Sequence, residues 1–322
     1  MFSHFLLLLC YLISFSIQLP FSRRALSNGP VISSDFPDPS FLNVGGTYYA
    51  FATTNGQQNI QSATSPDFAT WTVTGQDALP NLPSWSNGAS WAPDVIQLAD
   101  GTFLMYFTAL YTNSSMMHCL GTATSTMALG PYKASDTPLA CPLDVGGAID
   151  PSSFIDTDGT RYVVYKVDGN SLGGGGTCGN GDESHGTPIM LQALEADGVT
   201  PSGEPVQILD RDANDGPLVE APYLVLHEGT YVLFFSSNCF NGPYYDTSYA
   251  TATAINGPYT KAGSPLLASG GNNGAFNSPG GASIGGGGTQ MVFHSDQAAS
   301  DASVRQMWTA GITIDGTTVS IS

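Results

Sequence analysis

The sequence repeats one pattern five times, and this repeat constrains the fold more than any other feature. Each copy begins with a proline, continues through an apolar run to a turn that contains Gly-Thr, and ends in a run rich in Tyr, Phe and Val. The Gly-Thr pairs begin at Gly46, Gly101, Gly159, Gly229 and Gly288, so consecutive copies are 55, 58, 70 and 59 residues apart. Such a spacing leaves room for four short strands in every copy.

A weaker second pattern follows the copies. It begins at Ala63, Ala123, Ala250 and Ala310, and after the third copy it is reduced to LQALEADGVT. Each copy is therefore interpreted as two consecutive hairpins, and the five copies predict an all-β, five-bladed β-propeller over residues 28–322. A β-sandwich or a solenoid of similar hairpins is the alternative, although sandwiches rarely repeat one motif five times at this spacing.

The composition agrees with many short strands and excludes several classes of protein. The chain has 38 Gly and 21 Pro but only 8 Lys+Arg, so it is poor in residues that cover helix surfaces. Hydrophobic residues make up 42% of it, which is enough for a full core and excludes general disorder. The formal net charge of −18 repels phosphate groups, so no nucleic-acid partner is expected.

The first 27 residues are interpreted as a signal peptide. Residues 5–17 form an apolar run that is short for a membrane span, and Ala25-Leu26-Ser27 matches a small-x-small cleavage site. A membrane anchor remains the alternative. Once the signal peptide is removed, we expect a secreted, extracellular, monomeric protein without membrane attachment.

Four cysteines remain after the predicted signal peptide, as expected for a disulfide-bonded secreted protein. Three pairings are open, and the predicted one joins nearest neighbours: Cys119 with Cys141, and Cys178 with Cys239. The second bridge would hold a glycine-rich insertion, SLGGGGTCGNGDESHG from Ser171, over one face of the molecule. Asn113 begins the one glycosylation sequon, Asn-Ser-Ser.

Acidic residues recur where the first strand of a repeat begins. Asp38 and Asp150 directly precede the prolines of their repeats, and Glu220 stands two residues before its proline. First strands line the central channel of a propeller, so these carboxylates are expected to meet at one face, with the prolines favouring extended backbone for the preceding acids. Mutual repulsion and burial separate the pKa values of such groups, as glycoside hydrolysis by an acid and a base requires. The alternative is that each acid belongs to an ordinary turn.

The segments FPDPSF, WAPDV, AIDPSSF and VEAPYLV, in this order on five repeats, resemble glycoside hydrolase family 43 over residues 30–322. The resemblance implies that Asp38 is the general base, Glu220 the general acid, and Asp150 a carboxylate that orients Glu220 and raises its pKa. It implies an inverting enzyme that needs no cofactor and cleaves α-L-arabinofuranosyl linkages of plant cell-wall arabinan or arabinoxylan. A β-xylosidase of the same family and a carbohydrate-binding propeller without catalysis are the alternatives.

The resemblance also implies residues around the acids. His294, in MVFHSD, is expected in the central channel, where it would help to hold a water molecule or a calcium ion, and Arg305 is expected to reach the sugar hydroxyls from the last blade. Phe36 and Trp91 flank the acids in the sequence, and we expect both to offer apolar faces to a pentose ring. Either aromatic residue would otherwise belong to the core.

Overall fold

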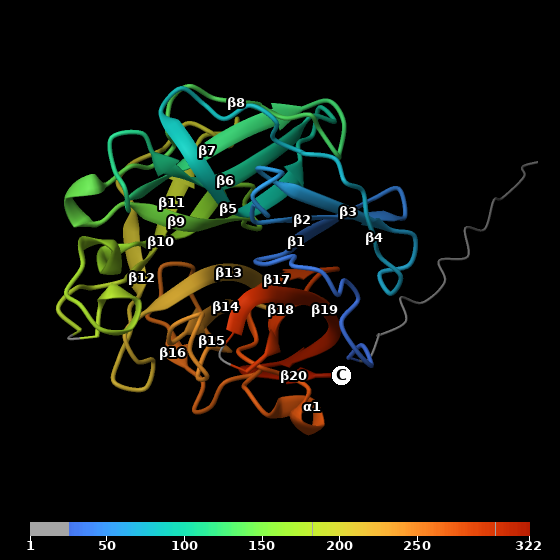
Figure 1. The fold of residues 1–322 in the computed structure, drawn as a ribbon, viewed down its shortest axis with the longest axis vertical. Coiled ribbons are helices and arrows are strands. Elements are labelled where there is room, and N and C mark those ends of the chain that lie inside the picture. The colour runs from blue at the N-terminus through green and yellow to red at the C-terminus, as the bar shows by residue number, and fades with distance from the viewer. Residues whose placement is uncertain (1–25, 182, 300) are drawn as a thin grey trace, which may run out of the picture.

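The computed structural model describes residues 26–181, 183–299 and 301–322, and its strands form five antiparallel sheets of four strands each. The five sheets are arranged as blades around a central axis, and each contains four consecutive strands of the chain (Figure 1). The predicted all-β, five-bladed propeller is therefore confirmed. The predicted signal peptide, residues 1–27, lies outside the described residues except for Leu26 and Ser27.

The strands are numbered in chain order, four to a blade. Blades one and two contain β1 (Ser40–Val44), β2 (Thr47–Ala52), β3 (Gln61–Ser65), β4 (Thr72–Val73), β5 (Ser86–Gln97), β6 (Phe103–Tyr111), β7 (His118–Ser125) and β8 (Lys133–Ala134). Blade three contains β9 (Ala148–Ile155), β10 (Arg161–Val167), β11 (Ile189–Leu194) and β12 (Val206–Leu209). Blades four and five contain β13 (Val219–His227), β14 (Thr230–Ser237), β15 (Asp246–Ala252), β16 (Thr260–Lys261), β17 (Gly280–Gly285), β18 (Gln290–Ala298), β19 (Asp301–Asp315) and β20 (Thr318–Ile321).

Helices are short and few among the described residues. They are the 3-10 turns η1 (Leu143–Val145), η2 (Gly169–Leu172) and η3 (Thr177–Gly179) and the single turn α1 (Gly271–Gly274). No helix in the described part of the chain has the length and apolar character needed to cross a membrane.

The first hairpin shows why the repeat contains Gly-Thr. Val44 of β1 pairs with Thr47 of β2, so the connection has only two residues, Gly45 and Gly46. Both have left-handed backbone, with φ of 60° and 91°, as a tight turn that matches the twist of the flanking strands requires.

The hydrophobic core lies between neighbouring blades. Phe51 of β2 and Phe107 of β6 are fully buried in one cluster between blades one and two. Phe234 of β14 and Phe293 of β18 are fully buried in another between blades four and five. Each blade is therefore stabilised by the apolar faces of the blades beside it.

The segment before β1 connects the last blade to the first. The N–H group of Val31 donates a hydrogen bond to the carbonyl oxygen of Met307 at 2.8 Å, and the N–H group of Met307 donates one to the carbonyl oxygen of Ile32 at 3.1 Å. Further along, the N–H group of Phe36 donates to the carbonyl oxygen of Arg305 at 2.8 Å. This segment thus runs alongside β19 before the chain enters β1, and it closes the ring of blades.

Both predicted disulfides are confirmed. One joins Cys119 to Cys141, and the other joins Cys178 of the glycine-rich insertion to Cys239, which follows β14. Asn113 is exposed in the turn between β6 and β7, and its glycosylation stays a prediction.

Candidate active site

The inner strand of each blade has a residue with left-handed backbone at the same place. These residues are Asp38 (φ 51°), Ala92 (41°), Asp150 (56°), Ala221 (49°) and Gly281 (60°). The strand pairing is irregular at four of these places, in β5, β9, β13 and β17, as in β-bulges, which turn side chains away from the regular pleat. The expectation of extended backbone at Asp38 and Asp150 is therefore wrong, and at Asp150 the bulge in β9 overrides the preference that a following proline imposes.

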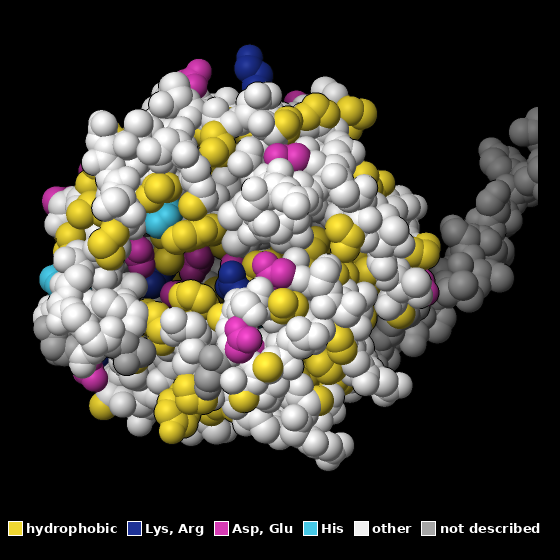
Figure 2. Space-filling model, in the orientation of Figure 1, with side chains coloured by type: hydrophobic (Ala, Val, Ile, Leu, Met, Phe, Trp, Pro, Cys, Tyr) yellow, Lys and Arg dark blue, Asp and Glu magenta, His cyan; other side chains and the backbone are white. Residues whose placement is uncertain are grey.

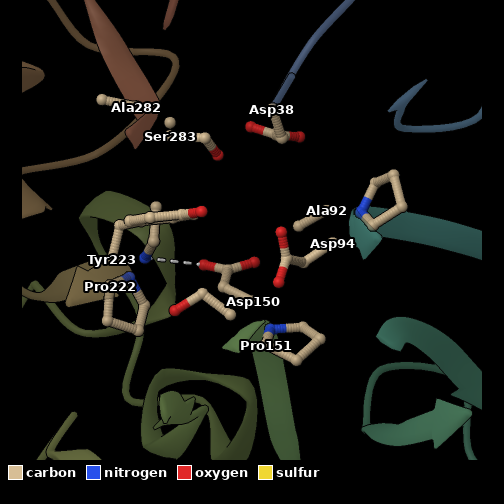
Figure 3. A pocket seen from close by; sticks show the side chains of 13 residues that line it. Asp38, Ala92, Asp94, Asp150, Pro151, Pro222, Tyr223, Ala282 and Ser283 are labelled. Atoms are coloured by element: carbon tan, nitrogen blue, oxygen red, sulfur yellow. Dashed lines mark hydrogen bonds between the residues drawn. The ribbon is translucent and has the colours of Figure 1, made fainter. Parts of the chain in front are cut away.

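These left-handed residues surround the axis of the propeller. Together with the residues that follow them, they line a channel cavity of about 30 Å³, which is room for about two water molecules (Figure 3). Asp94, which the sequence analysis did not single out, is buried in the wall of this channel. Its Oδ2 accepts hydrogen bonds from Ser153 Oγ at 2.6 Å and Ser153 N at 2.8 Å, and burial raises its pKa.

A larger cavity of about 550 Å³ opens beside this channel and contains the three predicted carboxylates. Asp38 reaches it from blade one, Asp150 from blade three and Glu220 from blade four. Figure 2 shows a hollow on this face of the molecule, with acidic and basic side chains in its floor and hydrophobic side chains around its rim. Glu220 lies one residue before the left-handed position of its blade, so it is not the strict equivalent of Asp38 and Asp150.

Asp38 is surrounded by groups that stabilise its charged form. Thr53 Oγ1 donates to Asp38 Oδ2 at 2.7 Å, and Arg305 Nη1 lies 3.3 Å from Asp38 Oδ1. Burial favours the neutral acid, but the charge of Arg305 and the hydrogen bond from Thr53 outweigh it, so the pKa of Asp38 is lowered. Asp38 is therefore an ionised carboxylate suited to accept a proton.

Glu220 is held by two buried partners. Lys166 Nζ lies 3.0 Å from Glu220 Oε2 and 3.0 Å from Asp168 Oδ1, and the Tyr245 hydroxyl donates to Glu220 Oε1 at 2.8 Å. The side chain of Lys166 is fully buried. Burial alone would lower its pKa, but the charges of Asp168 and Glu220 raise it, so Lys166 stays cationic between them.

The pKa of Asp150 is shifted in the opposite direction to that of Asp38. Its Oδ2 accepts a hydrogen bond from the Ala221 N–H at 2.9 Å, the bond drawn as a dashed line in Figure 3. Burial and the nearby charge of Glu220 raise the pKa of Asp150 well above its ordinary value. The cavity therefore has an ionised acid on blade one and, on blades three and four, an interacting pair that favours holding a proton.

His294 is fully buried behind Asp38 and Gly281, which line the channel, and its surroundings do not fit a calcium ligand. Its Nδ1 accepts a hydrogen bond from the Asp38 N–H at 3.1 Å, and burial lowers its pKa to about 3. The neutral ring therefore carries its proton on Nε2 and has no lone pair left for a cation. Within the described ranges, no three His, Cys, Asp or Glu side chains are grouped to hold a metal ion. Calcium stays a prediction of the sequence.

The two predicted aromatic residues lie in different places. Trp91 lines the larger cavity, as expected. Phe36 is fully buried in the core cluster that also contains Phe41 of β1 and Met307 of β19. The prediction that Phe36 contacts a sugar is therefore wrong, because its ring fills the space between blades one and five. Arg305 lines the cavity, and its guanidinium group also lies 5.3 Å from the centre of the Phe240 ring.

Several cavity residues were missed in the sequence. Lys166 had a readable signal, because it is a single cation in the apolar strand RYVVYKV, and a buried charge requires a partner. His118 and Tyr245 had none, because each enters the cavity from the beginning of an outer strand or the loop before it.

Comparisons with known proteins find similar sequences and similar folds. The family model "Glycosyl hydrolases family 43" matches residues 27–313. The "Extracellular endo-alpha-(1->5)-L-arabinanase 2" of Bacillus subtilis is 25% identical over 299 residues, which cover 83% of this chain and 59% of that protein. The "Probable arabinan endo-1,5-alpha-L-arabinosidase C" of Aspergillus niger is 31% identical over 224 residues, which cover 63% of this chain and 58% of that protein. The chain thus spans less than two thirds of the length of these relatives.

A solved structure extends the similarity to nearly the whole chain. The crystal structure of a thermostable family-43 glycoside hydrolase superimposes with a TM-score of 0.79 at 25% sequence identity. The match covers 93% of this chain and 96% of that one.

Proposed function

Because the chain belongs to family 43 of the glycosyl hydrolases, we propose that it is an inverting hydrolase of α-L-arabinofuranosyl linkages in plant cell-wall arabinan or arabinoxylan. The observation that carries the proposal is the convergence of Asp38, Asp150 and Glu220 on one cavity. The printed names of relatives, which include arabinanases, support arabinan as the substrate class. We also propose secretion after removal of residues 1–27, in line with the extracellular relatives.

In the proposed reaction, water attacks the anomeric carbon while the glycosidic C–O bond breaks. Asp38 takes a proton from this water, since Arg305 and Thr53 keep it ionised beforehand. Glu220 gives a proton to the departing sugar oxygen. Burial and the nearby charge of Glu220 raise the pKa of Asp150 well above its ordinary value, so the pair holds a proton next to Glu220.

The remaining lining of the cavity suits a neutral sugar. Trp91 and Phe240 offer apolar surface, and the charged side chains already have partners of opposite sign. Part of one wall is the glycine-rich insertion, through Ser171, Cys178 and Gly179. The disulfide to Cys239 holds this wall in place, and we infer that it restricts how far a polysaccharide extends beyond the cleaved bond.

The stereochemistry of the first product tests the mechanism. The purified protein is incubated with linear arabinan, arabinoxylan and xylo-oligosaccharides, and proton NMR records which anomer is released first. Inversion on the arabinose-containing substrates is expected. Retention of configuration would exclude the roles of Asp38 and Glu220, and activity on xylo-oligosaccharides alone would identify a β-xylosidase.

The role of Glu220 is tested by Glu220→Gln, which removes its acidic proton. We expect hydrolysis of arabinan to fall by a factor of about 10² or more, because general acid catalysis contributes about 10²–10⁴. Activated aryl arabinofuranosides should lose much less, because their leaving groups need no proton. Glu204→Gln, at an exposed position, is the matched control. Equal losses on both substrates would assign Glu220 another role.

A further inference from the structure

His118 is a buried side chain in the cavity wall whose hydrogen-bonding groups are unused. It is the first residue of β7, it is only 4% exposed, and it lines the cavity. Among the described residues, neither ring nitrogen has a hydrogen-bond partner, although the Met116 carbonyl lies near enough to favour a protonated ring. Nearly all buried polar groups in proteins are paired, so at least one of these nitrogens calls for a partner from outside the chain.

The ring of His118 is fixed in position. Its centre lies 3.8 Å from the centre of the Trp91 ring, with a tilt of 33° between the two planes. The neighbouring backbone leaves little freedom, because His118 forms a β-bridge with Gly147, where a Cβ atom would lie 2.3 Å from the His118 carbonyl oxygen. A ring held in this way is prepared for a ligand of fixed geometry.

The charge state of His118 indicates what kind of ligand fits. Burial lowers its pKa to about 4, against the smaller opposing influence of Asp168, so the ring is neutral at physiological pH. A neutral imidazole has one donor and one acceptor. A sugar hydroxyl likewise donates one hydrogen bond and accepts another. An anion would use only the donor of the imidazole, and a metal ion would use only its lone pair.

We propose that His118 binds a hydroxyl group of the sugar that occupies the cavity and, next to Trp91, selects where on the sugar that hydroxyl must lie. The inference rests on the proposed function, because it assumes a sugar in the same cavity as Asp38 and Glu220. A site built to pair with a hydroxyl rejects analogues that lack it, since the buried polar group is then left without a partner. His118 is thereby a residue that determines specificity.

The test compares two variants on a set of matched substrates. His118→Phe keeps a flat ring against Trp91 without hydrogen-bonding groups, and His118→Gln keeps a donor and an acceptor. The substrates are 4-nitrophenyl α-L-arabinofuranoside and its 2-, 3- and 5-deoxy analogues. We expect His118→Phe to lower kcat/KM on the parent substrate by about 10- to 100-fold, and His118→Gln to restore part of this loss. On one deoxy analogue the loss should nearly vanish.

Two controls separate binding from folding. His227→Phe makes the same change on β13, outside the cavity lining, and should leave kcat/KM unchanged. The thermal midpoint of His118→Phe should equal or exceed that of the wild type, because a buried unpaired group is removed. A loss of equal size on all four substrates, no loss at all, or a lower midpoint that accounts for the lost activity would overturn the inference.

Failure of the proposed function gives a different result. A wild-type protein that hydrolyses no pentoside would refute the proposed function itself. The role of His118 is then tested by calorimetric titration, which compares the binding of L-arabinose and D-xylose to the wild type and to His118→Phe. Weaker binding of either sugar to His118→Phe would still support the inference, and equal or absent binding in both proteins would overturn it.

Discussion

The charged side chains of the cavity form two sets, each with its own cation. Asp38 on blade one lies beside Arg305, and Glu220 on blade four lies beside Lys166, which also binds Asp168. Removing one partner of a buried ion pair leaves an uncompensated charge, which typically costs about 3–5 kcal/mol. Arg305 lowers the pKa of Asp38, and the ionisation of Asp38 is therefore one origin of pH dependence.

Arg305→Leu should move the acidic limb of the pH profile. Because the pKa of Asp38 is lowered in the folded protein, its charge stabilises the fold above pH about 4, and this contribution is lost as the pH falls through the lowered pKa. Without Arg305, burial dominates, and the pKa of Asp38 should rise above its ordinary value.

The measurement is kcat/KM against pH for the wild type and for Arg305→Leu. The acidic limb of Arg305→Leu is expected about one pH unit or more higher. Arg305→Lys retains a cation and should keep the limb near that of the wild type. An unchanged limb in Arg305→Leu would show that Arg305 does not control the ionisation of the base.

Among the secondary-structure elements, the inner strands are the ones that build the site. Their bulges place left-handed residues around the axis, and a non-glycine residue in such a conformation costs of order 1–3 kcal/mol. The repetition of this left-handed conformation is explained by what it achieves, because it directs Asp38 and Asp150 to the axis. In blade five the same position is Gly281, where a Cβ atom would lie 2.7 Å from His294 Nδ1 and 3.0 Å from Asp38 Oδ1.

Gly281→Ala should therefore damage the site as well as the strand. The added methyl group has to displace His294 or Asp38, and we expect kcat/KM to fall at least about tenfold, together with a lower thermal midpoint. Gly101→Ala is the matched control, because Gly101 also has left-handed backbone, with φ of 88°, but open space around its Cβ position.

Gly101→Ala should show only the backbone penalty of about 1–2 kcal/mol, with activity retained. The free energy of unfolding is measured by denaturant unfolding, and the activity is measured by hydrolysis of an aryl arabinofuranoside. Similar activity of the two variants would mean that the close approach at Gly281 has no functional consequence.

At the scale of the whole molecule, the site exists only in the closed ring. Its carboxylates come from blades one, three and four, and the core that positions each blade lies between blades. The segment around Ile32 joins blade five to blade one, and Ile32 itself is 4% exposed. Loosening this segment should therefore affect the whole ring.

Ile32→Ala should lower the free energy of unfolding by about 2–5 kcal/mol while unfolding stays a single transition. Tryptophan fluorescence and loss of activity during urea unfolding should report the same midpoint. Ile155→Ala, at a position that is 49% exposed, should change the stability little. Separate midpoints for fluorescence and activity in Ile32→Ala would show that blades unfold independently.

Much of the fold could be read in the sequence because its signals are local and repeated. The Gly-Thr turns and the apolar and aromatic runs beside them each depend on a few neighbouring residues, and together with the spacing of the copies they predicted the five blades. The pairing of Cys119 with Cys141 was found for a related reason, since the two are separated by only 22 residues, whereas Cys178 and Cys239 are 61 residues apart and were paired only as the remaining two cysteines. The acids before the prolines were found because they recur at the same point of the repeat.

The partners of those acids could not be read in this way. Lys166 and Glu220 are 54 residues apart, and Arg305 and Asp38 are 267 apart, so no local pattern relates them. Phe36 was misplaced because an aromatic residue beside an acid in sequence can point to the core or to the cavity, and only its packing against blade five decides. The unused nitrogens of His118 likewise become visible only when its surroundings are known.

By itself, then, the sequence determined the number of blades and the places of the three acids in the repeat, because repetition and short-range turn chemistry specify them. Only the tertiary structure decided which acid is ionised, which cation accompanies it, and which aromatic ring faces the cavity. The physical reason is that pKa values and burial depend on groups from other blades, and these meet only when the ring closes.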